Sequence, residues 1–193
     1  MTDGRNLPIL LDALARVAAV MDEQGRDHVF IGGIALAAWG RPRTTVDIDL
    51  MIFGSEDQAD LIIAALAESG FTIATEIERD VMMSGFRLRR IYREAQAGRP
   101  EMSVALDVLL SSNPVVRQII ERACRRRVGD VTISVPSAED FIVLKLQAGR
   151  MQDLADAQAV LREQRNSLNR EYLETTAEQF AVRELLERIR AAE

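Results

Sequence analysis

Two aspartates one residue apart, Asp47 and Asp49, are the side chains of this sequence best suited to chemistry. Side chains alternate along a β-strand, so the two carboxylates would share one face of a sheet while Val46, Ile48 and Leu50 share the other. Two neighbouring carboxylates repel each other and are costly to desolvate, and a divalent cation between them offsets both effects. Mg²⁺ suits such an open site, because substrate phosphates can complete its shell. The pair therefore predicts a magnesium–phosphate site.

A glycine pair upstream supplies the complementary half of such a site. Gly32 and Gly33 follow the short apolar run 28–31, which we interpret as a buried strand. Glycines at the start of a helix expose backbone N–H groups and let a phosphate approach them closely. Arg43, in the segment before the aspartates, could clamp a phosphate or neutralise the acidic pair. Together these residues predict that a triphosphate binds beside the metal.

Two further charged residues are candidates for the same site. Asp107 lies in an otherwise apolar strand, where a carboxylate is costly unless it is paired or metal-bound. If it faces the aspartate pair, it could bind a second metal or take the proton of an acceptor hydroxyl. Lys145 lies on an otherwise apolar helix face and would either reach toward solvent or contact the triphosphate. We interpret Asp153 and Asp156 as structural carboxylates, which could also pair with that lysine or with Arg150.

The periodicity of apolar and polar residues indicates the elements that would position these groups. The expected helices cover 7–24, 34–39, 56–69, 114–123, 138–149, 152–164 and 168–191, and the expected strands cover 28–31, 45–52, 71–76, 81–92, 101–110, 125–128 and 131–135. Ser137, followed by Asp140, resembles a capping box at the start of the C-terminal helices. This order predicts an α/β (α+β) fold with a small mixed β-sheet flanked by helices. We assign residues 1–136 to this core and residues 137–193 to a helical C-terminal part packed on it.

Composition and charge limit the classes of function. With 193 residues, of which 48% are hydrophobic and 28% charged, the chain suits one folded domain with or without a helical appendage. Its single cysteine, Cys124, can form no internal disulfide, which fits a reducing cytosol. No apolar run approaches the ~18 residues that span a bilayer, so we expect a soluble cytoplasmic protein without membrane contact. The net charge of -6 argues against bulk contact with nucleic acid, and the basic clusters 87–90 and 122–127 are either solvated edges or a groove for an RNA end.

The order of these motifs resembles the nucleotidyltransferase superfamily that includes DNA polymerase β, and especially its minimal bacterial members. Those proteins carry an apolar-Gly-Gly/Ser motif, then Asp-x-Asp on the next strand, then a third carboxylate, and the matching residues here are Gly32 and Gly33, Asp47 and Asp49, and Asp107. The segment Gly-Arg-Pro-Arg-Thr-Thr-x-Asp-x-Asp is similar to the AbiEii-like nucleotidyltransferases, some of which are toxins of toxin–antitoxin pairs. Many relatives have Ser at the position of Gly33, so phosphate binding here would depend on backbone N–H groups and nearby cations.

A downstream segment, in which Lys145 and Arg150 precede Asp153-x-x-Asp156, extends this resemblance so that it covers residues 28–157. The resemblance implies Mg²⁺-dependent transfer of an NMP group from an NTP to a hydroxyl acceptor, with a cognate antitoxin as a partner. It implies catalytic and metal-binding roles for Asp47, Asp49 and Asp107, and nucleotide or phosphate binding for Gly32, Gly33, Arg43 and Lys145. The acceptor stays open between an RNA end, a small molecule and a protein.

Two other interpretations of the aspartate pair stay open at this point. A metal-dependent glycosyltransferase also binds a metal–diphosphate through Asp-x-Asp, but it does not account for the glycine pair directly upstream. A non-catalytic relative could keep the motif as a nucleotide-binding or antitoxin-like module, although the motif here is intact. A dinucleotide-binding fold is disfavoured because no G-x-G-x-x-G follows the first strand, and a P-loop is also absent.

Overall fold

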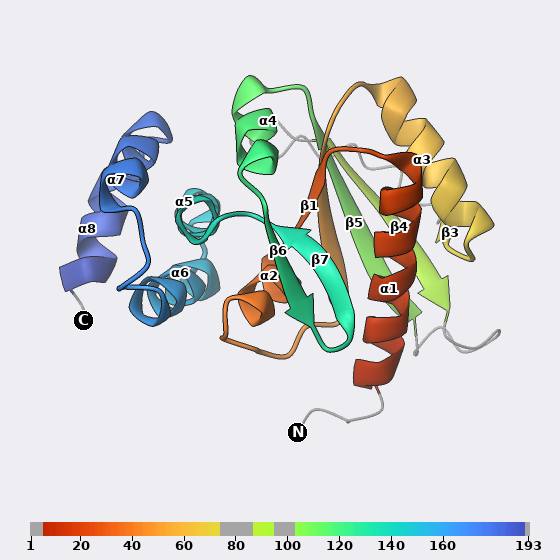
Figure 1. Ribbon diagram of the computed structural model, residues 1–193, viewed down its shortest axis with the longest axis horizontal. Helices are drawn as coiled ribbons and strands as arrows, with labels where there is room; N and C mark the ends of the chain where they lie inside the picture. The colour runs from red at the N-terminus through yellow and green to blue at the C-terminus, as the bar shows by residue number, and fades with distance from the viewer. Residues whose placement is uncertain (1–5, 74–86, 95–102, 192–193) are drawn as a thin grey trace.

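The computed structural model describes residues 6–73, 87–94 and 103–191, and Figure 1 shows the order of their elements. The helices are α1 (Asn6–Gln24), α2 (Gly32–Ala38), α3 (Glu56–Glu68), α4 (Pro114–Glu121), α5 (Ala138–Ala148), α6 (Met151–Glu163), α7 (Arg170–Gln179) and α8 (Arg183–Ala191). The strands are β1 (His28–Ile31), β2 (Asp47–Phe53), β3 (Thr72–Ile73), β4 (Arg87–Glu94), β5 (Ser103–Ser111), β6 (Cys124–Val128) and β7 (Val131–Val135). Helices flank a small mixed sheet and then continue alone, which confirms the expected fold class.

Five strands form one mixed sheet in the order β1-β2-β5-β4-β3. β2 and β5 are parallel, whereas the other neighbouring strands are antiparallel. β6 and β7, which match the expected strands 125–128 and 131–135, form a separate hairpin around Gly129 and Asp130, and β7 lies against β1. Because β2 is hydrogen-bonded on both sides, its register and the direction of its side chains are fixed by two neighbours.

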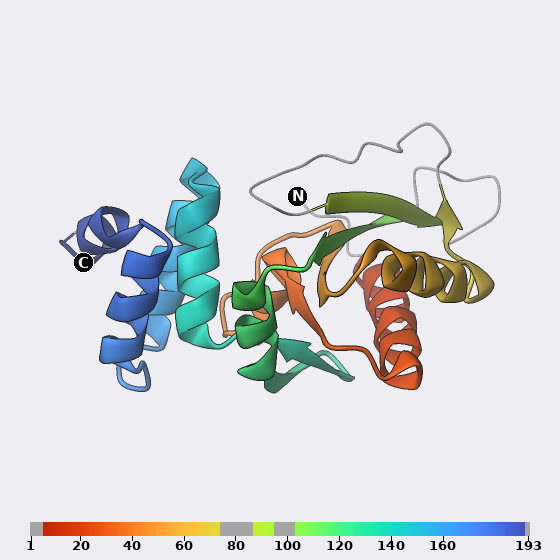
Figure 2. The ribbon, with the colours of Figure 1, turned by 90° about the horizontal axis from the view of Figure 1, so that it is seen from above.

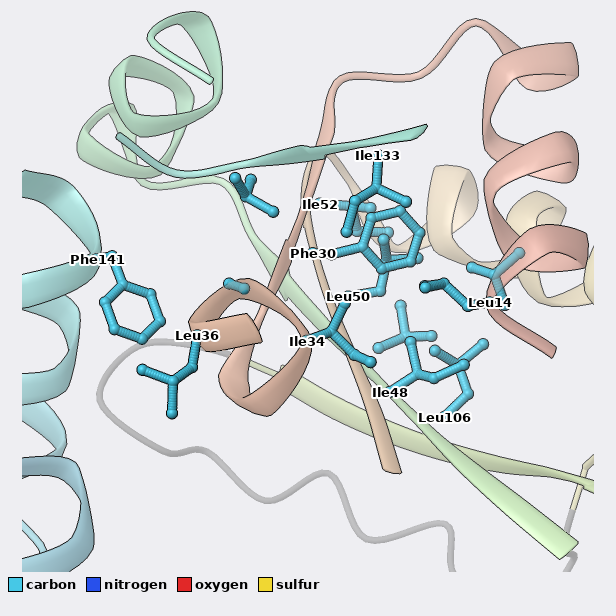
Figure 3. Packing of buried hydrophobic residues seen from close by; sticks show 14 of the residues in the cluster. Leu14, Phe30, Ile34, Leu36, Ile48, Leu50, Ile52, Leu106, Ile133 and Phe141 are labelled. Carbon is cyan, nitrogen blue, oxygen red and sulfur yellow. The ribbon is translucent and has the colours of Figure 1, made fainter. Parts of the chain in front are cut away.

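One face of the sheet forms the main hydrophobic core. Ile48, Leu50 and Ile52 of β2 point into it and are almost fully shielded from solvent. Figure 3 shows these side chains together with Leu14 of α1 and Ile133 of β7, which belong to the same buried cluster. Figure 1 shows α1 and the β6–β7 hairpin on this side of the sheet. The burial of this one face is what orients β2.

The opposite face of β2 carries the remaining side chains of that strand. Met51 is buried there against Ile119 and neighbouring apolar residues of α4. Asp47 and Asp49 lie four and two residues before Met51 in the same strand, so their side chains point to this second face as well. The pattern that builds the core thus places both aspartates outside it.

Helices α5–α8 gather beside the sheet at the C-terminal end of the chain (Figure 2). The sequence predicts a single helix over 168–191, and this prediction is wrong, because α7 and α8 are separate. Ala181 has a φ of 54°, in the left-handed region, and Val182 N donates to Ala177 O at 2.8 Å to end α7. The break lets α8 fold back against α6 and α7, which a straight helix could not do.

The other predicted elements are confirmed to within a few residues wherever the structure describes them. α2 begins at Gly32, two residues earlier than expected, and β2 begins at Asp47, two residues later than expected. Ser137 Oγ accepts the backbone N–H of Asp140 at 3.1 Å, which confirms the predicted cap of α5. The parts of the predicted strands that fall on 74–76, 81–86 and 101–102 lie outside the described residues. In the described part of the chain, no helix has the length and apolar character needed to cross a bilayer.

Candidate active site

The register between β2 and β5 brings three carboxylates to one face of the sheet. Asp49 is the direct partner of Asp107 in this parallel pair, and Asp47 is the partner of Ala105. Partners in adjacent strands point to the same side, and residues two apart in one strand do so as well. Asp47, Asp49 and Asp107 therefore share a face, which we call the acidic face. It is the face opposite the main core.

Gly32, the first residue of α2, lies directly beneath the carboxylate of Asp49. It has a φ of 62°, which favours glycine, and a Cβ added there would lie 1.8 Å from Asp49 Oδ2. Any larger residue at position 32 would push the carboxylate away. The glycine thus serves two purposes, since it allows the turn from β1 into α2 and leaves room for the aspartate.

Gly33 is restricted by a different neighbour, Thr45. A Cβ added at Gly33 would lie 2.7 Å from both Cβ and Oγ1 of that threonine. Thr45 Oγ1 in turn donates to Asp47 Oδ1 at 2.7 Å, so the threonine orients the first aspartate. The close packing gives a physical reason for glycine at this position.

The acidic face is electrostatically unfavourable in the absence of a cation. Burial, together with the charges of Asp47 and Asp107, raises the pKa of Asp49 to about 6. The positive charges of Lys145 and Arg150 lower it only in part. Carboxylate oxygens are the ligands that Mg²⁺ prefers, and a divalent cation would remove this repulsion. The donor set of Asp47 and Asp49 therefore fits a magnesium ion.

Asp107 is held differently from the other two carboxylates. Arg90 of β4 is its direct partner across the sheet, and the guanidinium donates from Nε to Oδ1 and from Nη2 to Oδ2. Within residues 6–73, 87–94 and 103–191, no group of three or more His, Cys, Asp or Glu side chains is arranged to hold a metal ion. In this structure the third carboxylate forms an ion pair with Arg90.

Sequence reasoning missed Arg90 as a member of the site. The residue belongs to the basic cluster 87–90, which the sequence assigns to a solvated edge or a groove for RNA. Strand alternation alone would show which face of β4 carries the arginine, but only the register with β5 shows that it meets Asp107. That register is not readable from residue types.

Lys145 is buried among carboxylates and does not reach toward solvent. Its Nζ donates to Asp153 Oδ1 at 2.8 Å and lies 3.0 Å from Asp156 Oδ2 without hydrogen-bond geometry. Arg150 also donates to Asp153, and Arg43 Nε lies 3.4 Å from Asp156 Oδ2. The ion pairs to Asp153 and Asp156 considered from the sequence are thus present, whereas the solvent-exposed alternative for Lys145 is wrong. We call Lys145, Arg150, Asp153 and Asp156 the ion cluster.

The ion cluster lies near the acidic face, since the positive charges of Lys145 and Arg150 both lower the pKa of Asp49. Within the cluster, burial opposes ionisation of Asp153, but hydrogen bonds from Arg150 and Lys145 outweigh it and lower its pKa. A cavity of about 370 Å³ lies on the side of the cluster that faces the loop before β2. Its lining includes Arg41, Arg43, Gln152 and Asp156.

Trp39, His28 and Cys124 each have a contact within the fold that accounts for them without a catalytic role. Trp39 is buried and donates from Nε1 to the carbonyl of Pro136 at 3.2 Å, so it packs α2 against the start of the helical part. His28 Nδ1 lies 2.8 Å from the carbonyl of Arg26, and burial lowers the pKa of its imidazole. Cys124 is a partly buried free thiol, which fits a packed side chain.

Comparison with known proteins places the chain in a family. Residues 12–193 match the family described as "Nucleotidyl transferase AbiEii toxin, Type IV TA system". No curated protein sequence matches the chain.

Solved structures support the same fold at low sequence identity. JHP933 from Helicobacter pylori matches with a TM-score of 0.61 and 13% identity, over 93% of this chain and 75% of that one. ANT(2'')-Ia in complex with adenylyl-2''-tobramycin matches with a TM-score of 0.58 and 15% identity, over 91% and 98%. An antigenic nucleotidyltransferase-like protein from Paracoccidioides brasiliensis matches with a TM-score of 0.56 and 17% identity, over 93% and 91%. Since the family match spans almost the whole chain, this protein belongs to the AbiEii nucleotidyltransferase toxin family of type IV toxin–antitoxin systems.

Proposed function

We propose that this nucleotidyltransferase uses Mg²⁺ to transfer an NMP group from an NTP to a hydroxyl acceptor at the acidic face. The single observation that carries the proposal is the pairing of Asp49 with Asp107 across two parallel strands, with Gly32 directly beneath the first carboxylate. This arrangement combines carboxylates that repel each other with a glycine pair at the start of a helix. Both features favour a metal-bound triphosphate as the ligand.

Asp47 and Asp49 would hold Mg²⁺, which would supply charge neutralisation at the phosphate oxygens of the transferred and leaving groups. Thr45 fixes Asp47 through its hydrogen bond, so this ligand is oriented before any substrate arrives. Asp107 is the third carboxylate, as a second-metal ligand or as the acceptor of the hydroxyl proton.

The phosphate groups would be bound by the glycine pair and by two cations. Gly32 and Gly33 let backbone N–H groups approach the β- and γ-phosphates. Arg43 is partly exposed at the cavity beside the ion cluster, so its guanidinium can reach an incoming phosphate. Lys145 donates to Asp153 and lies beside Asp156, so its ammonium keeps N–H donors for a phosphate oxygen.

The two parts of the chain would divide this work. We propose that residues 1–136 carry the carboxylates and glycines, and that residues 137–193 form a helical part that adds cations beside them. The boundary follows the change from mixed elements to helices after Val135.

Membership of a type IV toxin family implies an NTP substrate and a cognate antitoxin system. It also disfavours both alternatives considered from the sequence, a glycosyltransferase and a non-catalytic module. For the acceptor we retain an RNA end, a small molecule or a protein. The structure of ANT(2'')-Ia contains an adenylylated aminoglycoside, so one protein of this fold acts on a small molecule. The net charge of -6 mildly disfavours RNA.

The decisive experiment is incubation of the purified protein with each α-labelled NTP, Mg²⁺ and a cell extract, followed by separation of RNA, protein and small metabolites. We expect label from at least one NTP in one of these fractions, and none with the Asp47→Asn/Asp49→Asn double variant. Label transfer by that variant at the wild-type level would overturn the site. Absence of transfer from every NTP with every fraction would overturn the proposed reaction.

A further inference from the structure

Another cavity lies in the helical part and has no residue in common with the acidic face or the ion cluster. Its volume is about 300 Å³, and it is formed where the end of α6, the start of α7 and the last turn of α8 meet. Figures 1 and 2 both show α7 and α8 on the far side of α5 from the sheet. The lining consists of two leucines, three arginines and one glutamate, which are Leu161, Leu168, Arg165, Arg170, Arg190 and Glu174. We call it the arginine cavity.

The three guanidiniums of the arginine cavity differ in how their charges are compensated. The Arg190 side chain is 25% exposed, and its Nη1 lies 3.0 Å from Glu174 Oε1 and 3.2 Å from Glu187 Oε1. The guanidiniums of Arg165 and Arg170 have no hydrogen-bond or ion-pair partner in the part of the chain that the structure describes. Two positive charges therefore border the cavity without a counter-ion among the described side chains.

Hydrogen bonds hold the backbone around the cavity in place. Asn169, the residue before Arg170, donates from its backbone N–H to Glu139 Oε1 at 2.6 Å, which ties the start of α7 to α5. Gln158 Nε2 donates to the carbonyl of Ile189 at 3.3 Å, which ties α8 to α6. The cavity is thus formed by segments that are fixed before any ligand arrives, and this lowers the entropic cost of binding.

The lining indicates the chemistry of a ligand. Two guanidiniums without counter-ions match a phosphate monoester, which carries a charge of about −1.5 to −2 at neutral pH and accepts paired hydrogen bonds from arginine. Leu161 is buried and Leu168 partly buried in the hydrophobic core, so they add an apolar surface beside the charges. Glu174 keeps lone pairs beyond its bond to Arg190 and can accept hydrogen bonds from hydroxyl or amino groups. A nucleotide combines all three features in one molecule.

We propose that the arginine cavity is a second ligand site, which binds the phosphate monoester of a nucleotide. Arg165 and Arg170 hold the phosphate, and the two leucines contact the base or the sugar. The nucleotide is either a free nucleoside monophosphate or the terminal residue of a 5′-phosphorylated RNA. The site needs no metal and takes no part in the proposed transfer, so it goes beyond the proposed function.

Isothermal titration calorimetry in the presence of a chelator tests the proposal, because no metal–nucleotide complex can then form at the acidic face. The probes are the four nucleoside 5′-monophosphates, their nucleosides and inorganic phosphate. We expect at least one monophosphate to bind with a Kd below about 1 mM. Its nucleoside and inorganic phosphate should bind at least about tenfold more weakly, since each fills only one half of the cavity.

Charge-removing variants assign the binding to this cavity. Arg165→Gln/Arg170→Gln should weaken binding of the monophosphate at least about tenfold, because both charged donors are lost. Its melting temperature should equal that of wild type, since these guanidiniums hold no other described side chain. The matched control is Arg183→Gln/Arg188→Gln, which removes two arginines from a neighbouring cavity between α7 and α8. This control should keep the wild-type Kd within about twofold.

Two RNA oligonucleotides of the same sequence, one with a 5′-phosphate and one with a 5′-hydroxyl, distinguish the two sources of the phosphate. Binding that requires the 5′-phosphate and is lost in Arg165→Gln/Arg170→Gln identifies an RNA end, whereas binding of monophosphates alone identifies a free nucleotide. Absence of binding by every monophosphate and by the phosphorylated RNA would overturn the inference, as would equal binding by wild type and Arg165→Gln/Arg170→Gln. Either result would leave the proposed transfer at the acidic face standing, because no step of it uses this cavity.

Discussion

The acidic face and the ion cluster contain similar carboxylates in opposite electrostatic states. In the ion cluster, Asp153 has two cationic hydrogen-bond donors, and its pKa is lowered in spite of burial. On the acidic face, Asp49 has two carboxylates as close neighbours, and its pKa is raised to about 6. In the folded protein, the charge of Asp153 is compensated by Lys145 and Arg150, whereas that of Asp49 is compensated only in part.

We use this difference, and not burial, to distinguish Asp153 and Asp156 from the proposed metal-binding pair Asp47 and Asp49. Asp153 and Asp156 are buried more deeply than Asp47 and Asp49, yet they are the ones with resident counter-ions. Repulsion that persists in a folded protein lowers its stability, so we interpret it as the cost of keeping a cation site open. The following predictions test that distinction.

The largest effect is expected from Asp49→Asn, which we predict to reduce nucleotidyl transfer by about 10³-fold or more, because a charged metal ligand is lost. Unfolding in urea without divalent cations should show equal or higher stability, since the change removes one of the mutually repelling charges. The matched control is Asp130→Asn at the exposed hairpin turn, which should alter neither quantity. An Asp49→Asn protein that transfers label like wild type would remove the distinction between the two carboxylate groups.

The next largest effect is expected from Lys145→Met in the ion cluster. This change leaves Asp153 and Asp156 buried with less counter-charge, so we expect a loss of about 3–5 kcal/mol in the free energy of unfolding. Urea denaturation at neutral pH measures it. Arg183→Met, which breaks the exposed pair with Glu178, should cost at most about 1 kcal/mol. Equal effects of the two changes would show that the ion cluster does not stabilise the fold.

Lys145 also offers a direct check on burial, because it is the only lysine in the chain. An amine-acylating reagent should leave Lys145 of the native protein unmodified and reach it only on unfolding.

A third prediction concerns pH and uses the raised pKa of Asp49. Unfolded, this carboxyl titrates near 3.8, and folded it titrates near 6. Between these values the folded state binds the extra proton, so stability from this group is full below about pH 4 and falls as pH rises to 6. The loss amounts to about 2–3 kcal/mol. We expect the difference in unfolding free energy between Asp49→Asn and wild type, measured with a chelator present, to grow over this interval. A difference that is flat from pH 4 to pH 7 would contradict the assigned cause.

The smallest effect is expected at Gly33. Gly33→Ala places a Cβ against Thr45, and we expect it to cost about 1–2 kcal/mol of stability and to disturb the hydrogen bond to Asp47. Gly25→Ala is the control, because it adds a Cβ in open space and tests only the positive φ. Retention of wild-type stability and activity by Gly33→Ala would show that Thr45 can move freely.

The elements that carry periodic signals were predictable from the sequence. The alternation of apolar residues with Asp47 and Asp49, and the glycine pair before them, define the β1–α2–β2 unit without any tertiary information. The family membership that these motifs suggested is confirmed. The roles of the individual residues stay predictions.

The features that escaped prediction depend on tertiary pairing. Arg90 meets Asp107 through a strand register. The pairing of Lys145 with Asp153 or Asp156 was considered from the sequence, but the burial of the lysine follows from the packing of α6 on α5. The break between α7 and α8 falls at Ala181, and alanine is the strongest helix former, so no local signal marks it. In each case packing across the molecule outweighs the local preference.

The pairing of β2 with β5 also has a consequence for when the protein can act. A shift of that register by one residue would turn Asp107 into the core, since adjacent positions point to opposite faces. The two strands are separated in the sequence by α3, β3 and β4, so a nascent chain that ends before β5 carries the glycines and the first aspartates but not the third. The three carboxylates would thus come together only once β5 has been synthesised and has paired with β2.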